Sequence, residues 1–405
     1  MEIDEQKPPV DNRSGGAARK RFKKLIRAGI AVGLLGAVTW IVILSLRDKA
    51  SRQQAGTNSP NAETFLNLGE ECKAKADYDC AITNYTKAIE LNSKYAEAYL
   101  QRGRTYNKKG DPDQAIADFS KAIELNPQFA EAYAYRGGTY GLKGNHDQSL
   151  KDVNKAIELN PQLADAYLNR GTAHSNKGNY DQAISDYDKV IEISPQAADA
   201  YLNRGLILMQ KSKFDDAILN FSKAIELNPQ LPDAYYNRGI LYGNRGDREQ
   251  AVGDFSKVIE LVPQSAGAYY YRGISYGNMG KHDLSLRDAI KAIELDPKFT
   301  AAYVNRGTAY AKLGGTDHAI EDYSKAIELE PQLPEAYFNR GVSYNDKGSF
   351  AEAARDLNKA IELNPTYTLA YYNRALAYEG LGQKAKSKAD LRKYEELSAK
   401  EAGVR

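Results

Sequence analysis

Residues 96–129 read AEAYLQRGRTYNKKGDPDQAIADFSKAIELNPQF, and this stretch decides the fold. Close variants of it follow one another without insertion over most of the 405-residue chain. The ten copies start at Ala62, Ala96, Ala130, Ala164, Ala198, Pro232, Ala266, Thr300, Pro334 and Thr368. A fixed period of 34 residues predicts a stacked array built from one repeating unit.

Within each copy, two patterns predict two helices. In the quoted copy, Tyr99, Gly103 and Tyr106 recur at the i, i+4, i+7 spacing of one helical face. Gly110 is suited to a left-handed cap at the end of this first helix. A second helix follows and stops before Pro127, because the residue before a proline resists the helical conformation. One such pair cannot bury its own apolar face, so each copy is expected to pack on the next.

This period, with A-Y-x-N-R-G at the start and K-A-I-E-L-N-P near the end of a copy, resembles the tetratricopeptide repeat family. The resemblance implies an all-α fold: a right-handed superhelical solenoid of ten helix-turn-helix repeats and a C-terminal capping helix over residues 62–405. The first copy has Ala76 and Ser93 in place of the turn glycine and the proline. The tenth has Ala375 in a glycine position and a charged last helix, as expected of end caps.

One departure from the family pattern predicts an ion pair. Arginine stands in nine copies, from Arg102 to Arg374, where the family usually has leucine, and an acidic residue follows sixteen positions later in eight of them. The first copy has Leu68 and Asn84 instead, so the two positions change together. We predict a partly buried, bidentate bridge between the two helices of each repeat. The alternative is two independently solvated charges. The acidic positions are Asp118, Asp152, Asp186, Asp254, Asp288, Asp322, Asp356 and Asp390, and Arg204 faces Asn220.

The first sixty residues differ from the repeats. A basic tail, residues 1–27, precedes an uncharged run of 19 residues, AGIAVGLLGAVTWIVILSL at 28–46, which is long enough to cross a bilayer as one transmembrane helix. No small-residue cleavage site follows, so we expect an uncleaved signal-anchor. A polar linker, residues 47–61, leads into the repeats and is expected to be flexible.

The flanking charges predict the orientation of this anchor. The tail holds eight basic side chains and the linker three. The positive-inside rule therefore places the N-terminus in the cytoplasm and the repeats on the opposite side of the membrane, which is the periplasm in a bacterium. Gly29, Gly33 and Ala37 fall four residues apart, a spacing that can seat a second helix, so a homodimer through the anchor is a further hypothesis.

The remaining composition favours a binding protein over an enzyme. The repeats are mildly acidic within a chain of net charge +2, so no basic stripe for nucleic acid is predicted. No catalytic motif or metal-ligand spacing occurs, and we expect no cofactor and no metal. Cys72 and Cys80 flank the first turn. They form either a disulfide that staples the first repeat or two buried thiols.

The resemblance implies that the first helices of the repeats line a concave groove. The sixth position of the copies carries an asparagine ladder similar to that of O-linked N-acetylglucosamine transferases, whose amides hold a peptide backbone. A carboxamide offers both a donor and an acceptor, so it pairs with any peptide unit. Packing between repeats is the alternative role. The ladder consists of Asn67, Asn169, Asn203, Asn237, Asn305, Asn339 and Asn373.

Apolar side chains of the middle copies predict a strip along the same groove. Contiguous apolar surface of this kind usually marks a binding site. The alternative is that some of these side chains pack between neighbouring first helices. The predicted strip comprises Leu202, Leu206, Tyr236, Ile240, Tyr270, Tyr271 and Ile274.

Two function classes follow from these patterns. The first is a membrane-anchored scaffold whose groove binds a peptide segment of a partner protein, in envelope assembly or complex maturation. The second is a self-associating structural spacer or lattice protein without a peptide client. An adaptor for a separate glycosyltransferase is a third hypothesis, and it rests only on the resemblance of the ladder.

Overall fold

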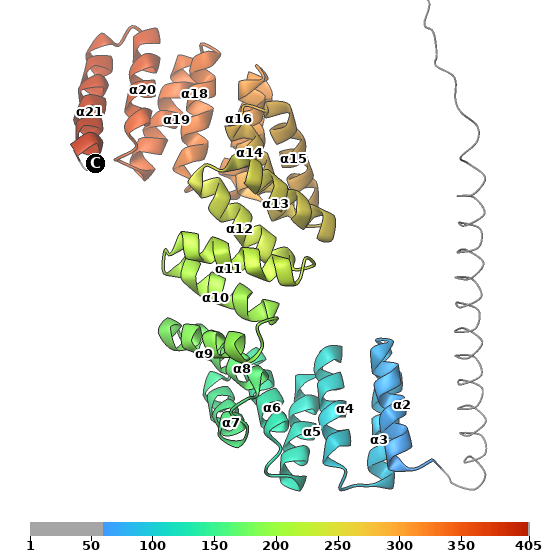
Figure 1. The fold of residues 1–405 in the computed structure, drawn as a ribbon. Coiled ribbons are helices and arrows are strands. Elements are labelled where there is room, and N and C mark those ends of the chain that lie inside the picture. Colours follow the sequence, from blue (N-terminus) through green and yellow to red (C-terminus); the bar gives the residue numbers. More distant parts are fainter. Residues whose placement is uncertain (1–59, 404–405) are drawn as a thin grey trace, which may run out of the picture. The chain divides into compact units, whose positions relative to one another are not determined.

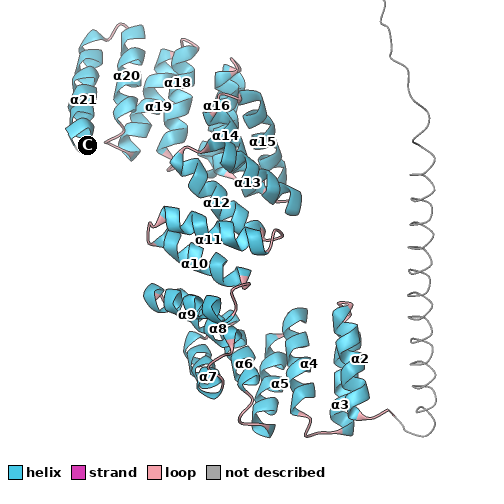
Figure 2. Cartoon of the chain, in the orientation of Figure 1, coloured by secondary structure: helices cyan, strands magenta, loops and turns pink. Residues whose placement is uncertain are grey.

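The computed structural model describes residues 60–403, and the regular structure of this range is helical throughout (Figure 2). Its twenty helices, α2 to α21, alternate as the first and second helices of ten repeats (Figure 1). None of the helices within residues 60–403 has the length and apolar character needed to cross a membrane. The predicted anchor at residues 28–46, its small-residue face and the basic tail lie outside the described residues.

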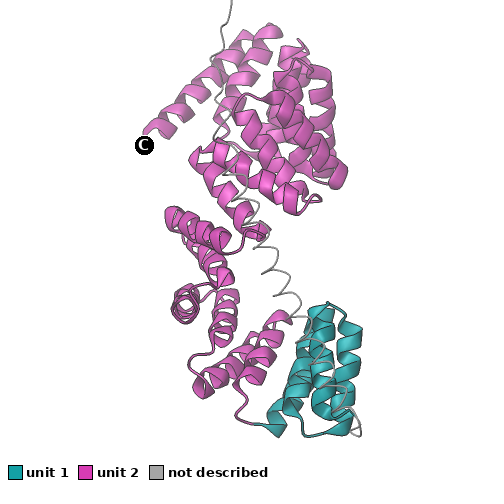
Figure 3. Ribbon diagram, turned by 45° about the vertical axis from the view of Figure 1, so that its right-hand side comes forward, with its two compact units in different colours: residues 1–126 teal, residues 127–405 magenta. Residues whose placement is uncertain are grey.

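The chain divides into two compact units, residues 1–126 and 127–405 (Figure 3). In the first unit the helices are α2 (Ala62–Ala74), α3 (Tyr78–Leu91), α4 (Ala96–Lys109) and α5 (Pro112–Leu125). The second unit begins with α6 (Ala130–Leu142), α7 (His146–Leu159), α8 (Ala164–Asn176), α9 (Tyr180–Ile193), α10 (Ala198–Gln210), α11 (Phe214–Leu227), α12 (Pro232–Arg245) and α13 (Arg248–Leu261). It continues with α14 (Ala266–Asn278), α15 (His282–Leu295), α16 (Thr300–Lys312), α17 (Thr316–Leu329), α18 (Pro334–Asp346), α19 (Phe350–Leu363), α20 (Thr368–Gly380) and α21 (Lys384–Gly403).

A residue in the left-handed conformation separates the two helices of each repeat. Gly110, with φ of 87°, caps α4, and Gly246, with φ of 94°, caps α12, as the turn glycines predict. Two turns use residues for which this conformation is strained: Ala76 in the first repeat, with φ of 57°, and Ser212 in the fifth, with φ of 58°. The sequence pattern pointed to Ala76 but not to Ser212.

Close contact between the two helices of a repeat depends on a small residue in the first helix. A Cβ added at Gly103 would lie 2.7 Å from Cε1 of Phe119, which is fully buried. Gly205 stands in the same relation to Phe221, at the same 2.7 Å. A buried side chain of the second helix therefore fills the space that the glycine leaves, and the same contact joins Gly171 to Tyr187 and Gly341 to Leu357.

The predicted ion pairs are present and bidentate. In α4 and α5, Nε and Nη2 of Arg102 donate to the two carboxylate oxygens of Asp118, both at 2.8 Å. Hydrogen bonds to Asp288 raise the pKa of Arg272 in the corresponding bridge of α14 and α15. The aspartate side chains of these bridges are 5–11% exposed, so the pairs are largely buried. The same bridge occurs at Arg136–Asp152, Arg170–Asp186, Arg238–Asp254, Arg306–Asp322, Arg340–Asp356 and Arg374–Asp390.

The third nitrogen of most of these arginines reaches back to the preceding repeat, which the sequence did not predict. Nη1 of Arg238 donates to Oγ of Ser222 on α11 at 2.9 Å, and Nη1 of Arg374 donates to Oδ1 of Asn358 on α19 at 2.6 Å. Arg204 is the partial exception, because it meets Asn220 in its own repeat and Asp188 in the repeat before. One guanidinium group thus connects three helices and couples neighbouring repeats.

A second series of ion pairs runs along the turn edge of the array. A basic residue at the end of a first helix meets an aspartate at the start of the preceding second helix, as in Lys177–Asp147 at 2.6 Å and Arg245–Asp215 at 3.1 Å. Lys347–Asp317 repeats the contact near the C-terminal end. Met279 and Leu313 occupy the basic position in the two repeats that start at Ala266 and Thr300, so the series is interrupted there.

The first repeat is held together differently. Cys72 of α2 and Cys80 of α3 form a disulfide, with Cα atoms 5.7 Å apart. Nδ2 of Asn84, at the position of the bridge aspartates, lies 3.4 Å from Sγ of Cys80 and donates to the carbonyl oxygen of Cys80 at 2.9 Å. Leu68, at the arginine position, is 39% exposed. A covalent bond therefore joins the helices that an ion pair joins elsewhere.

Candidate functional site

Three neighbouring hollows lie along the middle repeats of the second unit. We call them the edge hollow, the central hollow and the α16 hollow, with volumes of about 260, 160 and 300 Å³. The edge hollow is lined by Phe214, Asp215, Ile218, Leu241, Asn244 and Arg245. Asn244 also lines the central hollow, and Ile274 lines both the central and the α16 hollow. The three spaces thus adjoin one another in a row along α11, α12, α14 and α16, with Asn244 and Ile274 at the boundaries between them.

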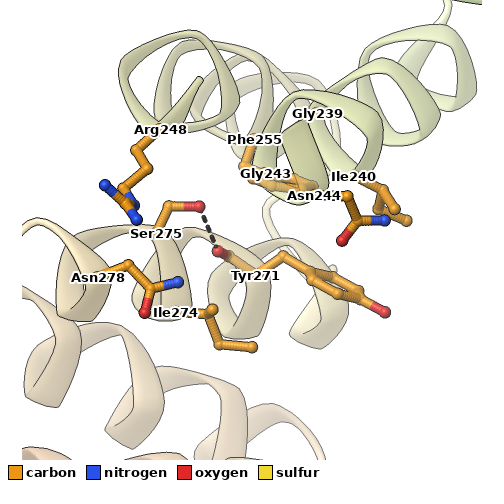
Figure 4. A pocket seen from close by; sticks show the side chains of 10 residues that line it. All are labelled: Gly239, Ile240, Gly243, Asn244, Arg248, Phe255, Tyr271, Ile274, Ser275 and Asn278. Atoms are coloured by element: carbon orange, nitrogen blue, oxygen red, sulfur yellow. Dashed lines mark hydrogen bonds between the residues drawn. The ribbon is translucent and has the colours of Figure 1, made fainter. Parts of the chain in front are cut away.

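The central hollow has an apolar interior and a polar end. Phe255 of α13, which is 1% exposed, stacks on Tyr271 of α14 with ring centroids 5.6 Å apart. Ile240 of α12 and Ile274 of α14 also border the space. Figure 4 shows Arg248, from the start of α13, at the end of the hollow away from the Tyr271 ring. The hollow therefore offers an apolar surface with a guanidinium group at its rim.

The α16 hollow combines apolar side chains with one ladder asparagine. Tyr270, Ile274, Val304 and Leu333 supply most of its apolar lining. Asn305 lines the same space, and its buried Nδ2 atom has no hydrogen-bond partner within residues 60–403. A buried donor without a partner costs about 1–3 kcal/mol, so an acceptor that entered the hollow and reached this amide would recover free energy.

Aromatic rings organise the wall between the central and the α16 hollow. Tyr236 of α12 meets Tyr271 edge-on at 5.7 Å, and Tyr270 meets Tyr271 at 5.1 Å and Phe299 at 4.8 Å. Burial raises the pKa of both Tyr236 and Tyr270, so these hydroxyl groups stay neutral near pH 7. The wall therefore presents rigid apolar faces, which suit side-chain recognition.

Charges along the row are distributed unevenly. At the edge hollow, Arg245 is paired with both Asp215 and Asp247. Arg248 of the central hollow and Glu335 of the α16 hollow are both exposed, and neither has an ion-pair partner in the part of the chain that the structure describes. An unpaired cation and an unpaired anion thus stand at different points of the row.

The structure brings five of the predicted site residues into this row. Ile240, Tyr271 and Ile274 line the central hollow, and Tyr270, Ile274 and Asn305 line the α16 hollow. Leu202 is 8% exposed and belongs to a core cluster on which Leu206 also packs. Tyr236 does not line the hollows but contacts the ring of Tyr271 edge-on. For Leu202 and Leu206, the alternative role of packing between helices describes their surroundings better than a place on the row.

Other ladder asparagines take several roles. Nδ2 of Asn169 donates to the backbone carbonyl of Ala134 in the preceding repeat at 3.1 Å, which is a packing contact. Asn237 and Asn373 donate to carbonyls of their own helices, at 2.8 and 2.9 Å. Asn203 and Asn339 are half-buried, and Asn67 is exposed on α2 in the first unit. The amides therefore do not form one uniform ladder in this structure.

Sequence reasoning missed Asn244, Arg248 and Thr308 as lining residues. The repeat pattern carried no clear signal for Arg248, because its position varies among tyrosine, phenylalanine, histidine, proline, threonine and lysine in the other copies.

Comparison with known proteins places the repeats in one family. Models described as "TPR repeat" match residues 69–110, 139–178, 205–246, 316–348 and 343–382. Models described as "Tetratricopeptide repeat" match residues 96–129, 164–196, 233–265, 266–299 and 369–401. Together these matches extend over most of the chain from residue 69 to residue 401. No protein of curated function matches the chain.

Several solved structures are similar to parts of the chain. A crystal structure of MamA is 32% identical, over 40% of this chain and 95% of its own, with a TM-score of 0.35. YrrB, described as a TPR protein with an unusual peptide-binding site, is 27% identical over 45% of this chain and 95% of its own, with a TM-score of 0.40. PilF from Pseudomonas aeruginosa is 20% identical over 51% of this chain and 94% of its own, with a TM-score of 0.48. Because these models match most of the chain and residues 60–403 form ten helix pairs, the chain belongs to the tetratricopeptide repeat family.

Proposed function

We propose that this chain is a membrane-anchored scaffold that binds a peptide segment of a partner protein along the row of hollows. Proteins of the tetratricopeptide repeat family generally mediate protein–protein interaction, and such repeat scaffolds are typically non-catalytic. The row supplies what side-chain recognition requires: concave apolar surface with a few polar groups at fixed positions.

The observation that carries this proposal is that the three hollows adjoin one another. They share Asn244 and Ile274, so one segment of peptide can enter neighbouring hollows without leaving the surface. An isolated pocket would suit a small molecule instead. A row that crosses successive first helices suits a chain that carries several side chains in sequence.

The ladder contributes to the proposed binding at one position of this row. The side chain of Asn305 borders the α16 hollow, and its Nδ2 atom has no hydrogen-bond partner within residues 60–403. This atom is buried against Gly273, so the amide would rotate into the hollow to donate to a backbone carbonyl of the bound segment. Triple replacement of Asn203, Asn237 and Asn305 by alanine is expected to weaken peptide binding while the helical content is retained.

The proposed anchor at residues 28–46 would hold the repeats on the side of the membrane opposite the basic tail. The periplasm of a bacterium and a role in envelope assembly or complex maturation fit this arrangement. Protease added to intact spheroplasts tests it, because the repeats should be digested while a tag placed before residue 1 stays protected. A protected repeat region would overturn this orientation.

Site-specific photo-crosslinking in cells tests the binding surface. A photoreactive residue replaces the exposed Asn278, which lines the central hollow, and in a control it replaces the exposed Glu294 of α15. We expect a discrete adduct from position 278 and none from position 294. Equal adducts from both positions would contradict the proposed surface.

A blocking substitution makes this test specific to the row. Asn244→Trp places a large ring at the point where the edge and central hollows meet, on an exposed position that tolerates it. Asn176 occupies the same position of its own repeat on α8, is also exposed and does not line the row, so Asn176→Trp is the matched control. The adduct from position 278 should disappear with the first substitution and persist with the second.

Self-association is a second candidate function, and α20 supplies the observation that favours it. Leu369, Tyr372 and Leu376 recur at i, i+3, i+7 and are 52%, 40% and 39% exposed. The equivalent residues Phe338 and Val342 of α18 are only half-exposed. The helix α20, which is the first helix of the tenth repeat, therefore has an exposed apolar face, which a second copy of the chain could cover.

Sedimentation velocity of the detergent-solubilised chain tests this candidate against the anchor. If α20 mediates association, Leu376→Lys should give monomers, while Gly33→Leu should leave the distribution unchanged. Monomers from Gly33→Leu alone would assign the association to the predicted anchor helix instead. A monomeric wild-type chain at all concentrations would exclude the lattice function.

A further inference from the structure

The row of hollows also indicates what kind of peptide it binds. We infer that the bound segment places apolar side chains in the central and α16 hollows, an acidic residue beside Arg248 and a basic residue beside Glu335. This inference rests on the proposed function and specifies the chemistry of the partner at that same site. It also gives the segment a direction, from its acidic to its basic end.

The apolar anchors follow from the linings of the two hollows. Ile240, Phe255 and Tyr271 surround the central hollow, and Tyr270 and Val304 belong to the α16 hollow. Ile274 separates the two spaces and contributes to both. A segment that crosses Ile274 therefore buries one apolar side chain on each side of it, and burial of apolar surface is the main favourable contribution to such binding.

The acidic end follows from Arg248. This side chain is exposed at the rim of the central hollow and has no ion-pair partner within residues 60–403, in contrast to Arg245, whose two aspartate partners occupy it. Its guanidinium group offers several donors in a planar arrangement that matches a carboxylate. A carboxylate of the bound segment is the ligand that fits this group.

The basic residue of the bound segment is inferred from a position near the start of the first helices that is acidic in most repeats. Asp165, Asp199 and Asp233 occupy this position in α8, α10 and α12, but Gly267 and Ala301 replace it in α14 and α16. Glu335 of α18 restores the carboxylate at the border of the α16 hollow. The starts of α14 and α16 thus lack this acidic residue, and the carboxylate returns at Glu335 on the α16 hollow.

These two charges determine orientation more than affinity. Both side chains are exposed, so each pair with the bound segment contributes modestly and is weakened by salt. A segment bound in the reverse direction would place like charges together at both ends, which disfavours it. The apolar anchors therefore supply most of the affinity, and the unpaired charges select the direction.

A peptide selection tests this inference. Random twelve-residue peptides displayed on phage are selected against the full-length protein in detergent micelles. We expect enrichment of peptides with two apolar residues that have an acidic residue on one side and a basic residue on the other. A synthetic peptide with the enriched sequence should bind Arg248→Glu about three- to tenfold more weakly, as expected for one exposed pair. Replacing its acidic residue by lysine should restore binding to that variant.

The converse variant tests the other end. Glu335→Lys should weaken binding of the same peptide to a similar extent. Binding should return when the basic residue of the peptide is replaced by glutamate. Matched controls reverse a charge at the same repeat positions outside the row: Lys384→Glu for Arg248, and Asp199→Lys for Glu335. Both controls should bind the original peptide with unchanged affinity.

The outcomes separate this inference from the proposed function. If the selected peptides lose binding to Asn244→Trp but keep their charge preference with Arg248→Glu and Glu335→Lys, the row binds peptides and the inferred direction is wrong. If no peptide is enriched, or if Asn244→Trp leaves binding unchanged, both the proposed function and this inference fail.

Discussion

The two helices of the first repeat and those of the second repeat are joined by different kinds of bond. In α4 and α5, a buried ion pair between Arg102 and Asp118 joins the two helices, whereas in α2 and α3 the Cys72–Cys80 disulfide does so. The arginine also needs a preceding second helix to receive its third nitrogen, as Thr86 does for Arg102. No copy of the repeat precedes Ala62 in the sequence, so within residues 60–403 a guanidinium group at position 68 would lack that acceptor.

This difference indicates that the ion pair serves the array as much as the single repeat. A buried ion pair contributes little by itself, because desolvation offsets much of its attraction. Its value here lies in the additional hydrogen bond across the repeat boundary. In the first repeat, leucine and asparagine occupy the positions of the ion pair, and a disulfide joins the two helices. The predictions below test this comparison, from the largest expected effect to the smallest.

The largest effect is expected when one bridge partner is removed. Arg238→Leu leaves Asp254, which is 6% exposed, without its partner, and we expect a loss of about 3–5 kcal/mol of local stability. Combining it with Asp254→Asn recreates the leucine–asparagine pair of the first repeat, and the loss should become smaller. Native-state hydrogen exchange in α12 and α13 measures both variants. A double variant as unstable as the single one would contradict the pairing.

The next effect concerns the disulfide. Replacing Cys72 and Cys80 by serine is expected to lower the stability of the first repeat by about 2–3 kcal/mol, as estimated from the short loop that the bond closes. Hydrogen exchange in α2 and α3 should quicken, while α20 and α21 stay unchanged. A reductant should have the same effect on the wild-type chain and none on the serine variant. Equal exchange in all three samples would show that the bond does not stabilise the repeat.

Replacing the disulfide of the first repeat by an ion pair should give a smaller effect on stability. In the serine variant, Leu68→Arg together with Asn84→Asp introduces the ion pair into the first repeat. We expect recovery of about 1 kcal/mol only, because position 68 is 39% exposed and the third nitrogen finds no preceding repeat. Hydrogen exchange of α2 and α3 reports the gain. Full recovery to wild-type stability would show that the preceding repeat is not required.

The smallest effect is expected at the turns. Ala76 of the first repeat adopts the left-handed conformation with φ of 57°, where Gly110 stands in the second. Ala76→Gly should stabilise the first repeat by about 0.5–1 kcal/mol, because it removes this strain. Ser212→Gly should do the same in the fifth repeat, and Gly110→Ala should have the opposite sign. The change in exchange protection of the adjoining helices measures each variant.

Much of the fold could be predicted from the sequence because it is periodic. The turn glycines, the paired helices and the Arg–Asp bridges each recur at one fixed interval, so comparing copies within the chain exposed them. The covariation of Leu68 with Asn84 was informative for the same reason. The third hydrogen bond of most of these arginines escaped notice, because the acceptor changes among serine, threonine, asparagine and aspartate from one copy to the next.

The candidate site was harder to predict, because the hollows depend on what the neighbouring repeat leaves open. Asn169 reaches back to the Ala134 carbonyl, and a Cβ at Gly138 would lie 2.9 Å from its amide nitrogen. Leu206 stands in the position of Gly138 in the repeat before Asn237, and Asn237 turns to its own helix. The role of each asparagine thus depends on the side chain one repeat earlier, which a single-position ladder does not capture.

The interrupted series of edge ion pairs has a mechanical consequence. Met279 and Leu313 break this series at the two repeat junctions that carry the central and α16 hollows. The ion pairs Arg245–Asp215 and Lys347–Asp317 connect neighbouring repeats on either side of this gap. We expect the array to be most compliant between them, so that its spacing can adjust to the width of a bound segment. A pulling force on the chain would then separate these repeats before the repeats on either side. Mechanical tension would thus release the bound peptide segment.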